Sequence, residues 1–485
     1  MRATILSIIV LLLTASFAVA RSSQAEAQSS VLTFNLVALD AKGGPLRDLP
    51  ASDLRIYDDG KLMQAVFCRP LETAERPSTL LGPGEYSNRP TGSNWQSILV
   101  LLDLLNANFA ERGQGWNELG RTFQKLESGE HFYVYLLTKE GTFYPIHALP
   151  GAESPASPGD ADWAAQVPSL LDQAMHNVNR LRPWEFQVNP DARIGKTIAA
   201  LRDLASDFAA QPGRKSLVWI SHGVPIDATG PDGLRKDYMP VVMGLGTDLA
   251  RSGIAVYAMD QQEHATPGMD SADSLQEIAA LTAGKWFPGN SVEKAIQQAV
   301  SDGHAAYQVG YIPPLDRWDN KFHKLRVTAA TKGVRLRATE GYFGDVRQAD
   351  ATQRLALATF GQADDPGIGI RATTVLSEKV KGWSRFQIRV DAADLRLTPG
   401  EAYIGEFAVT LAYYTTEWQP DASQEVAVKL HLTPAEHDTA MRDGVSLSVD
   451  RPVPAGARKV RIVVRDNQSG AVGSLSIPVA ASPEA

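Results

Sequence analysis

The stretch SILVLLDLLNAN, Ser97 to Asn108, decides the fold. After the serine it runs through five consecutive apolar residues, which is typical of a strand covered by helices on both faces. The run stops at Asp103, and asparagines soon follow. In folds with a mostly parallel sheet, a side chain directly after such a strand lies at the edge where ligands bind. Asp103 is therefore the first candidate for a metal-binding or catalytic residue.

The segment 95–300 around this stretch alternates between predicted strands and helices. HFYVYLLTK, SLVWIS and IAVYAMD predict further strands, and Glu140-Gly141 predicts a tight antiparallel hairpin. Together they predict a doubly wound sheet with one hairpin at its edge. The polar side chains expected at its carboxyl edge are Asp103, Ser221, His222 and Asp260.

The chain on both sides of this block is predicted to form β-structure. Residues 29–70 alternate with a period of two and contain an Asp-Gly turn, and residues 303–345 return to strands. We expect these two segments to complete one sandwich, into which the α/β domain is inserted. Residues 368–485 predict a separate C-terminal β-sandwich. The expected linkers are residues 71–94 and 346–367.

Composition and the N-terminus indicate where the protein acts. The 485 residues are 44% hydrophobic and 21% charged, with a formal net charge of -8 and no basic stripe, so a nucleic-acid partner is not expected. Residues 1–20, or 1–27, predict a secretory signal peptide, because Arg2 precedes a short apolar run that ends in small residues. An uncleaved anchor is the alternative. No other stretch predicts a membrane span, so we expect an exported protein, periplasmic or secreted.

Several separated motifs resemble one known family. They are DLLN at 103–106, PGRKSLVWIS at 212–221, GIAVYAMD at 253–260 and EIAALTAG at 277–284. They are similar to the exported von Willebrand factor A-related (VWFA-related) family of the acidobacterial type, and the match runs in order over residues 30–345. The resemblance implies a von Willebrand A-type domain, and such domains mostly bind other proteins.

The resemblance also implies a comparison with the metal-ion-dependent adhesion site (MIDAS) of such domains. That site uses Asp-x-Ser-x-Ser after the first strand, and a threonine and an aspartate from two later loops. Asp103 matches the first position, but Leu105 and Ala107 replace the serines, and His222 stands where the later aspartate is expected.

The remaining loop offers little to complete such a site. ALPGAESPASPG, after the hairpin, has Ser154 and Ser157 but no threonine. A hard cation such as Mg²⁺ needs about six oxygens, so the sequence predicts a degenerate site and no cofactor. A divalent metal held by Asp103 with Asn106, His222 and Asp260 is kept as an alternative. The simpler interpretation is that Asp103 caps a helix or bonds to loop amides.

Two short motifs are not expected to form active sites. WISHG at 219–223 lacks the first glycine of a nucleophile elbow, and Pro225 follows where a helix should begin. Gly195-Lys196-Thr197 resembles the end of a phosphate loop, but it lies inside a helical pattern and is assigned to the helix surface.

We therefore expect a non-enzymatic exported protein, adhesive or scaffold-like, with an unknown protein partner. The alternatives are a metal-assisted hydrolase that uses Asp103, His222 and Asp260, and a structural envelope component. The partner-binding candidates are Asn106, Asn108, His222, Asp260 and Trp184.

Overall fold

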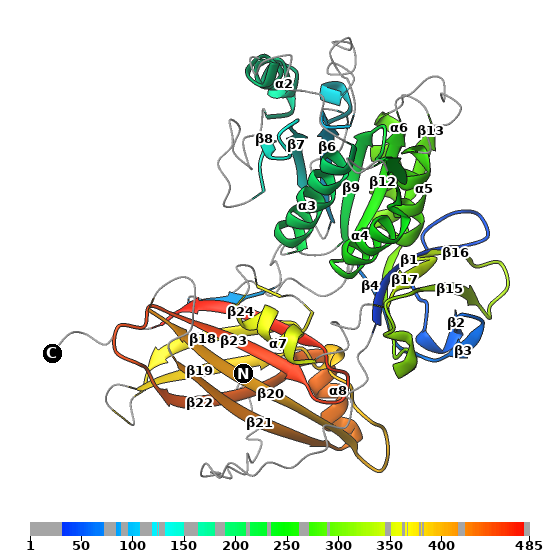
Figure 1. Cartoon of the computed structure of the whole chain (residues 1–485). Helices are drawn as coiled ribbons and strands as arrows, with labels where there is room; N and C mark the ends of the chain where they lie inside the picture. Colours follow the sequence, from blue (N-terminus) through cyan, green and yellow to red (C-terminus); the bar gives the residue numbers. More distant parts are fainter. Residues whose placement is uncertain are drawn as a thin grey trace. The chain divides into compact units, whose positions relative to one another are not determined.

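The computed structural model describes residues 32–71, 84–88, 96–106, 119–123, 125, 131–149, 163–179, 190–209, 214–229, 234–260, 271–288, 292–344, 351–360, 364–365, 367–377, 380, 383–415 and 422–479. The described residues fall into two compact units. The first consists of residues 31–82 and 89–350, and the second chiefly of residues 83–88 and 351–485. The predicted combination of α/β and all-β parts is confirmed (Figure 1).

The α/β part of the first unit contains a sheet in the order β13-β12-β9-β6-β7-β8. Every neighbouring pair is parallel except β7 and β8, which form the antiparallel edge hairpin. The central strand β6 is buried along its whole length, as its apolar sequence predicts. The strands are β6 (Gln96–Asp103), β7 (His131–Leu137), β8 (Phe143–His147), β9 (Arg214–Ser221), β12 (Ile254–Asp260) and β13 (Lys285–Pro288).

Helices cover both faces of this sheet, because successive side chains of a strand point to opposite faces. Leu99 and Leu101 of β6 pack in one core with α3, α4 and α5, and Ile98 and Val100 pack in the other with α2 and α6. A small hairpin, β10 (Asp227–Thr229) and β11 (Arg235–Asp237), follows β9. The helices are α2 (Trp163–Asn179), α3 (Pro190–Ala209), α4 (Met239–Arg251), α5 (Ser271–Leu281) and α6 (Val292–Gly303).

The first unit also contains a small β-domain of two four-stranded sheets, ordered β16-β1-β14-β4 and β17-β15-β2-β3. The segments before and after the α/β part share these sheets: Leu36 of β1 pairs with Tyr307 of β14. They also share one apolar core, in which Phe34, Ile56 and Tyr342 are buried. The strands are β1 (Leu32–Leu39), β2 (Leu54–Asp58), β3 (Lys61–Met63), β4 (Ala65–Pro70), β14 (Ala306–Tyr311), β15 (Phe322–Ala329), β16 (Arg335–Ala338) and β17 (Gly341–Phe343).

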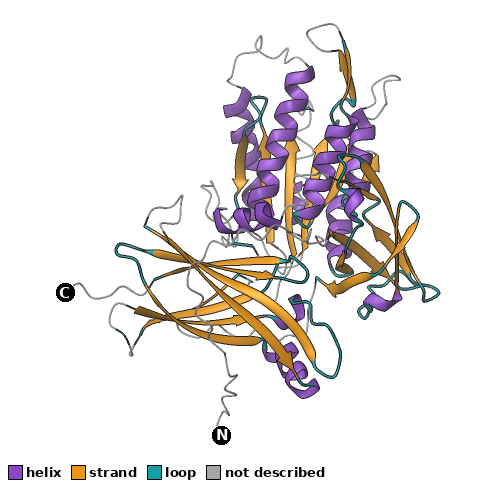
Figure 2. Cartoon of the chain, turned by 60° about the horizontal axis from the view of Figure 1, so that its bottom comes forward, coloured by secondary structure: helices purple, strands orange, loops and turns teal. Residues whose placement is uncertain are grey.

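The second unit is a β-sandwich (Figure 2). Its two sheets are ordered β22-β19-β18-β5 and β21-β20-β23-β24. Its core contains residues of both sheets, including Phe386 and Phe407. The elements are β5 (Glu85–Ser87), α7 (Ala351–Phe360), β18 (Ile370–Leu376), β19 (Trp383–Val390), β20 (Tyr403–Tyr414), β21 (Ala422–Leu432), α8 (Pro434–Asp443), β22 (Val445–Pro452), β23 (Lys459–Asp466) and β24 (Val472–Pro478).

Both predicted linkers contain packed residues, which corrects their assignment. In 71–94, strand β5 pairs with β18, and the side chain of Asn88 donates to the carbonyls of Asp365 and Ile368 at 2.8 Å. In 346–367, helix α7 buries Ala358. The turn-rich composition of residues 71–94 did not predict the three-residue strand β5, because so short a strand shows no periodicity.

The predicted signal peptide, residues 1–20 or 1–27, lies outside the described residues. Within the described part of the chain, no helix combines the length and the apolar character that a membrane span needs.

Candidate site at the carboxyl edge of the central sheet

The chain order reverses between β6 and β9, and this switch point is where doubly wound sheets bind ligands. β7 and β8 follow β6 on one side, whereas β9, β12 and β13 lie on the other. Leu102 pairs with Ile220, and Ser221 pairs with Asp260. Asp103, Ser221 and Asp260 are therefore the last residues of three adjacent strands and lie together at the carboxyl end of the sheet, as the sequence predicts.

Asp103 is fully buried and accepts hydrogen bonds from five donors of its own chain. Its Oδ1 accepts from the backbone N–H groups of Leu105 and Asn106, each at 3.0 Å. Its Oδ2 accepts from Asn106 Nδ2 at 2.8 Å, from Trp219 Nε1 at 3.1 Å and from Ser221 Oγ at 2.8 Å. The loop after β6 is thus folded around this carboxylate.

The electrostatics of Asp103 combine two opposing effects. Burial raises the pKa of its carboxyl group above the usual value, while the hydrogen bonds from Asn106, Ser221 and Trp219 act in the opposite direction. Each of the five partners donates, and an ionised carboxylate only accepts, so the hydrogen bonds favour the charged form, whereas burial, the larger effect, favours the neutral form. The five donors supply the partial positive charge that an ionised carboxylate needs when it is buried.

A metal ion at Asp103 would have to displace these bonds. A carboxylate has about four lone-pair positions, and five donors already share them. Ser221 Oγ also accepts from the backbone N–H of Gly223 at 2.9 Å. Leu105, in place of a serine, is only 8% exposed and packs in the core with α3. The geometry therefore corresponds to the simpler interpretation, in which Asp103 bonds to loop amides.

Asn106 connects this cluster to helix α3. Its Nδ2 donates to Asp103 and to Thr197 Oγ1, both at 2.8 Å, and Thr197 donates to the carbonyl of Arg193. Thr197 is fully buried, so its assignment to the helix surface is wrong. Its spacing from Ile194 and Leu201 places it on the apolar face of α3, and this spacing was the signal that could have found it.

His222 and Asp260 form a separate pair beside this cluster. His222 Nδ1 lies 3.3 Å from Asp260 Oδ1, and their side chains are 21% and 13% exposed. Among the described residues, the one group of metal-ligand side chains with ligand atoms within 4.8 Å of one another is Asp58, Asp59 and His323. Asp103, His222 and Asp260 therefore do not converge on a shared metal position.

Several sequence candidates lie outside the described residues: Asn108, Trp184, Ser154 and Ser157. Sequence reasoning did not assign Trp219 or Thr197 to the cluster, although both contribute to it. The Asp58–Asp59–His323 group lies in the small β-domain rather than at the edge of the central sheet, and it was not singled out.

No family model matches the chain, and no curated protein matches it. Among solved structures, the human COPII-coat protein Sec24c is 12% identical over 54% of this chain and 46% of that chain, with a TM-score of 0.23. The manganese-loaded TRAP protein of Plasmodium vivax is 11% identical over 53% of this chain and 95% of that chain, with a TM-score of 0.24. The chain spans 46% of the length of Sec24c. TM-scores at this level carry no argument about fold or function.

Proposed function

We propose that residues 96–303 form a von Willebrand A-type domain that binds a protein partner through the loops at the carboxyl edge of its sheet, without a metal ion at Asp103. The observation that carries this proposal is the closed carboxylate, whose oxygens accept five hydrogen bonds from the chain itself. The strand order and the edge hairpin support the domain type. On this proposal the protein is exported and non-enzymatic.

The described part of the contact surface would include His222 and Asp260. Both are partly exposed: His222 directly follows β9, and Asp260 ends the adjacent strand β12. Asn106 is only 8% exposed and positions the loop instead. A hydrolase would need Asp103 to join His222 and Asp260, and these three do not form a group of converging ligand atoms. The binding function is therefore favoured over hydrolysis.

Site-specific photo-crosslinking tests this function. A photoreactive amino acid is placed at His222, and in a control at Ser252, which precedes β12 and so marks the opposite edge of the same sheet. In the cells that produce the protein, we expect a defined crosslinked partner from position 222, with or without EDTA, and none from position 252. A crosslink that needs Mg²⁺ and disappears in Asp103→Asn would contradict the metal-free mode. Equal crosslinking from both edges would contradict the binding surface.

A further inference from the structure

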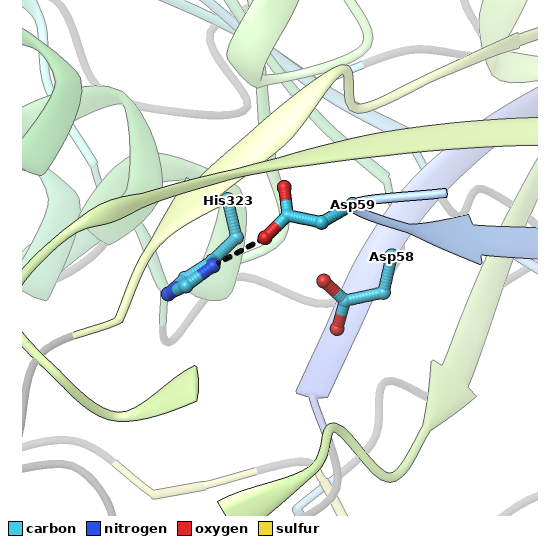
Figure 3. Close-up of side chains that lie close together, drawn as sticks. All are labelled: Asp58, Asp59 and His323. Atoms are coloured by element: carbon cyan, nitrogen blue, oxygen red, sulfur yellow. Dashed lines mark hydrogen bonds and ion pairs between the residues drawn. The ribbon is translucent and has the colours of Figure 1, made fainter. Parts of the chain in front are cut away.

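A hairpin turn places two aspartates beside a histidine in the small β-domain (Figure 3). Asp58 ends β2 and pairs with Lys61 of β3, so Asp59 and Gly60 form a two-residue turn. Their φ angles of 46° and 83° are both in the left-handed region, where aspartate and glycine are favoured. His323 lies on β15, the neighbour of β2 in the sheet. The turn thus meets a strand that is distant in sequence.

The three side chains offer ligand atoms that converge. One atom from each lies within 4.8 Å of the others, and Asp59 Oδ2 is 2.8 Å from His323 Nδ1. Asp58 is fully buried and His323 is 4% exposed, whereas the side chain of Asp59 is 35% exposed. The group therefore lies at the end of a core but is reached from solvent on the side of Asp59.

Each of the three side chains is also held by a partner outside the group. The hydroxyls of Tyr311 and Tyr342 donate to Asp58 Oδ2 at 3.0 and 3.1 Å. These two hydrogen bonds hold the Asp58 carboxylate in place through its Oδ2 atom.

Two further partners complete this outer layer. The backbone N–H of Lys324 donates to Asp59 Oδ1 at 2.9 Å, and His323 Nε2 lies 3.1 Å from Asp319 Oδ1. A histidine whose second nitrogen faces a carboxylate is the usual arrangement around protein-bound metal ions, because the carboxylate fixes the tautomer and the ring orientation. The nitrogen that faces the aspartates is then Nδ1.

The buried oxygen Oδ1 of Asp58 accepts no hydrogen bond from the described residues. The side chain points toward the other two members of the group (Figure 3). A buried carboxylate oxygen that accepts no hydrogen bond is costly, and it calls for a water molecule, an ion or a charged side chain beside it. The group that faces it is the guanidinium of Arg317, with Nε at 3.4 Å, while Arg317 Nη1 lies 3.5 Å from Asp59 Oδ2.

Arg317 balances the charge of the two aspartates without donating a hydrogen bond to either of them. Its Nε, although buried, also makes no hydrogen bond within the described residues. The side chain is 21% exposed and comes from a short 3₁₀ turn, Leu315–Arg317, so it has a route toward solvent. A second cation could therefore replace it at the aspartates.

We propose that Asp58, Asp59 and His323 form a binding site for a divalent transition-metal ion of the zinc class, which Arg317 vacates when the ion binds. One imidazole nitrogen and two carboxylate oxygens are ligands that zinc accepts. The ion would join the β2–β3 turn to β15, across a sequence separation of 264 residues. This site is independent of the proposed partner-binding edge.

Metal titration of the untagged, full-length, EDTA-treated protein tests the site. Binding of Zn²⁺ is measured by calorimetry, and Co²⁺ is followed by its visible absorption. We expect one ion per chain and a rise in melting temperature. Asp59→Asn should abolish binding, because asparagine keeps the left-handed turn but loses the charge. Asp319→Asn should weaken binding about tenfold, and Arg317→Gln should strengthen it by about tenfold or more, since a nearby positive charge is removed.

Two control variants test whether the ion binds at these three residues rather than at another carboxylate of the chain. Asp40→Asn removes a carboxylate from an exposed turn of the same β-domain, and it should leave metal binding unchanged. Asp103→Asn should also leave it unchanged. Absence of binding in both the wild type and Arg317→Gln would overturn the proposal and identify the group as an ion-pair network. Binding that survives Asp59→Asn but is lost in Asp103→Asn would overturn it in favour of the central sheet.

Discussion

Asp103 and Asp58 are both fully buried aspartates that end a strand, yet they have different surroundings. Asp103 accepts hydrogen bonds from two backbone amides and three side chains, all of them neutral. Asp58 accepts from two phenol hydroxyls, keeps one oxygen that accepts no hydrogen bond from the described residues, and lies among Asp59, His323 and Arg317.

Both carboxylates are buried at strand ends, so neither burial nor position explains the difference between them. The difference lies in the number of hydrogen-bond donors, which is five at Asp103 and two at Asp58. At the carboxyl end of the central sheet, N–H and O–H groups of the chain itself surround the carboxylate of Asp103. In the small β-domain, where no ligand was expected, the carboxylates face one another and a cationic side chain. Substitutions around Asp103 and around Asp58 can test this contrast.

The largest effect is expected from Asp103→Ala. It leaves up to five buried donors without an acceptor, so we expect the free energy of unfolding to fall by about 4 kcal/mol. Urea titration of the metal-free protein measures this loss. Asp438→Ala, at an aspartate whose side chain is 82% exposed, serves as the control and should change stability little. A loss below about 1 kcal/mol for Asp103→Ala would mean that the loop rearranges and that the closed cluster is not important for stability.

A smaller loss is expected from Ser221→Ala. The serine hydroxyl donates to Asp103 and accepts from Gly223, and its removal should cost about 2 kcal/mol. Ser216→Ala is a matched control on the same strand, because Ser216 is also fully buried but its hydroxyl has no hydrogen-bond partner in the described structure. Urea titrations should therefore show a larger loss in the free energy of unfolding for Ser221→Ala than for Ser216→Ala. Equal losses would mean that removal of any buried serine from β9 has this cost.

Tyr342→Phe should cost about 1 kcal/mol, because Asp58 keeps the hydroxyl of Tyr311 when that of Tyr342 is removed. Tyr413→Phe is the matched control, since the buried hydroxyl of Tyr413 has no partner among the described residues. Thermal melts in EDTA compare the two variants. A larger loss for Tyr413→Phe would argue that the phenols do not hold the Asp58 carboxylate.

The smallest effect concerns pH. Burial raises the pKa of Asp103 in the folded state above its usual value of 3.8, so the folded state binds more protons than the unfolded state just above that pH. The contribution of Asp103 to stability is therefore fully present below pH 3.8 and declines as the pH rises through the folded-state pKa. Relative to Asp103→Asn, the wild type should lose stability with rising pH.

Asp40 provides the comparison of opposite sign. The backbone N–H of Gly44 lowers the pKa of Asp40, with help from Lys42 and Gly43 and against burial. Its contribution is present above the usual pKa of 3.8 and is lost as the pH falls through the folded-state pKa. Urea titrations across the acidic range should show opposite slopes for Asp103→Asn and Asp40→Asn against the wild type. Slopes of the same sign would show that the donors around Asp103 outweigh its burial.

Local patterns predicted much of this architecture. The apolar run before Asp103 identified the central strand and its polar end, and Asp-Gly identified the β2–β3 turn. These features depend on residues that are close together in the sequence. Periodicity also predicted β-structure on both sides of the α/β part.

What could not be predicted depends on contacts between distant segments. The donor Trp219 and the acceptor Thr197 reach Asp103 and Asn106 only after the strands are ordered in the sheet. The same holds for His323, which meets Asp59 across 264 residues. The short strand β5 is similar, because it is a strand only through its pairing with β18. Each of these depends on a register that local periodicity does not contain.

The small β-domain is built from two segments, and this has a consequence for biosynthesis. Asp58 meets Tyr342 across 284 residues, so its sheet cannot be completed until the ribosome has made the whole α/β part. At about 5–20 residues per second, the first strands wait for about 15–60 s. During that time their edges are unpaired and open to incorrect pairing. Strands β1 to β4 therefore belong to a domain that can be completed only after the α/β part has been synthesised.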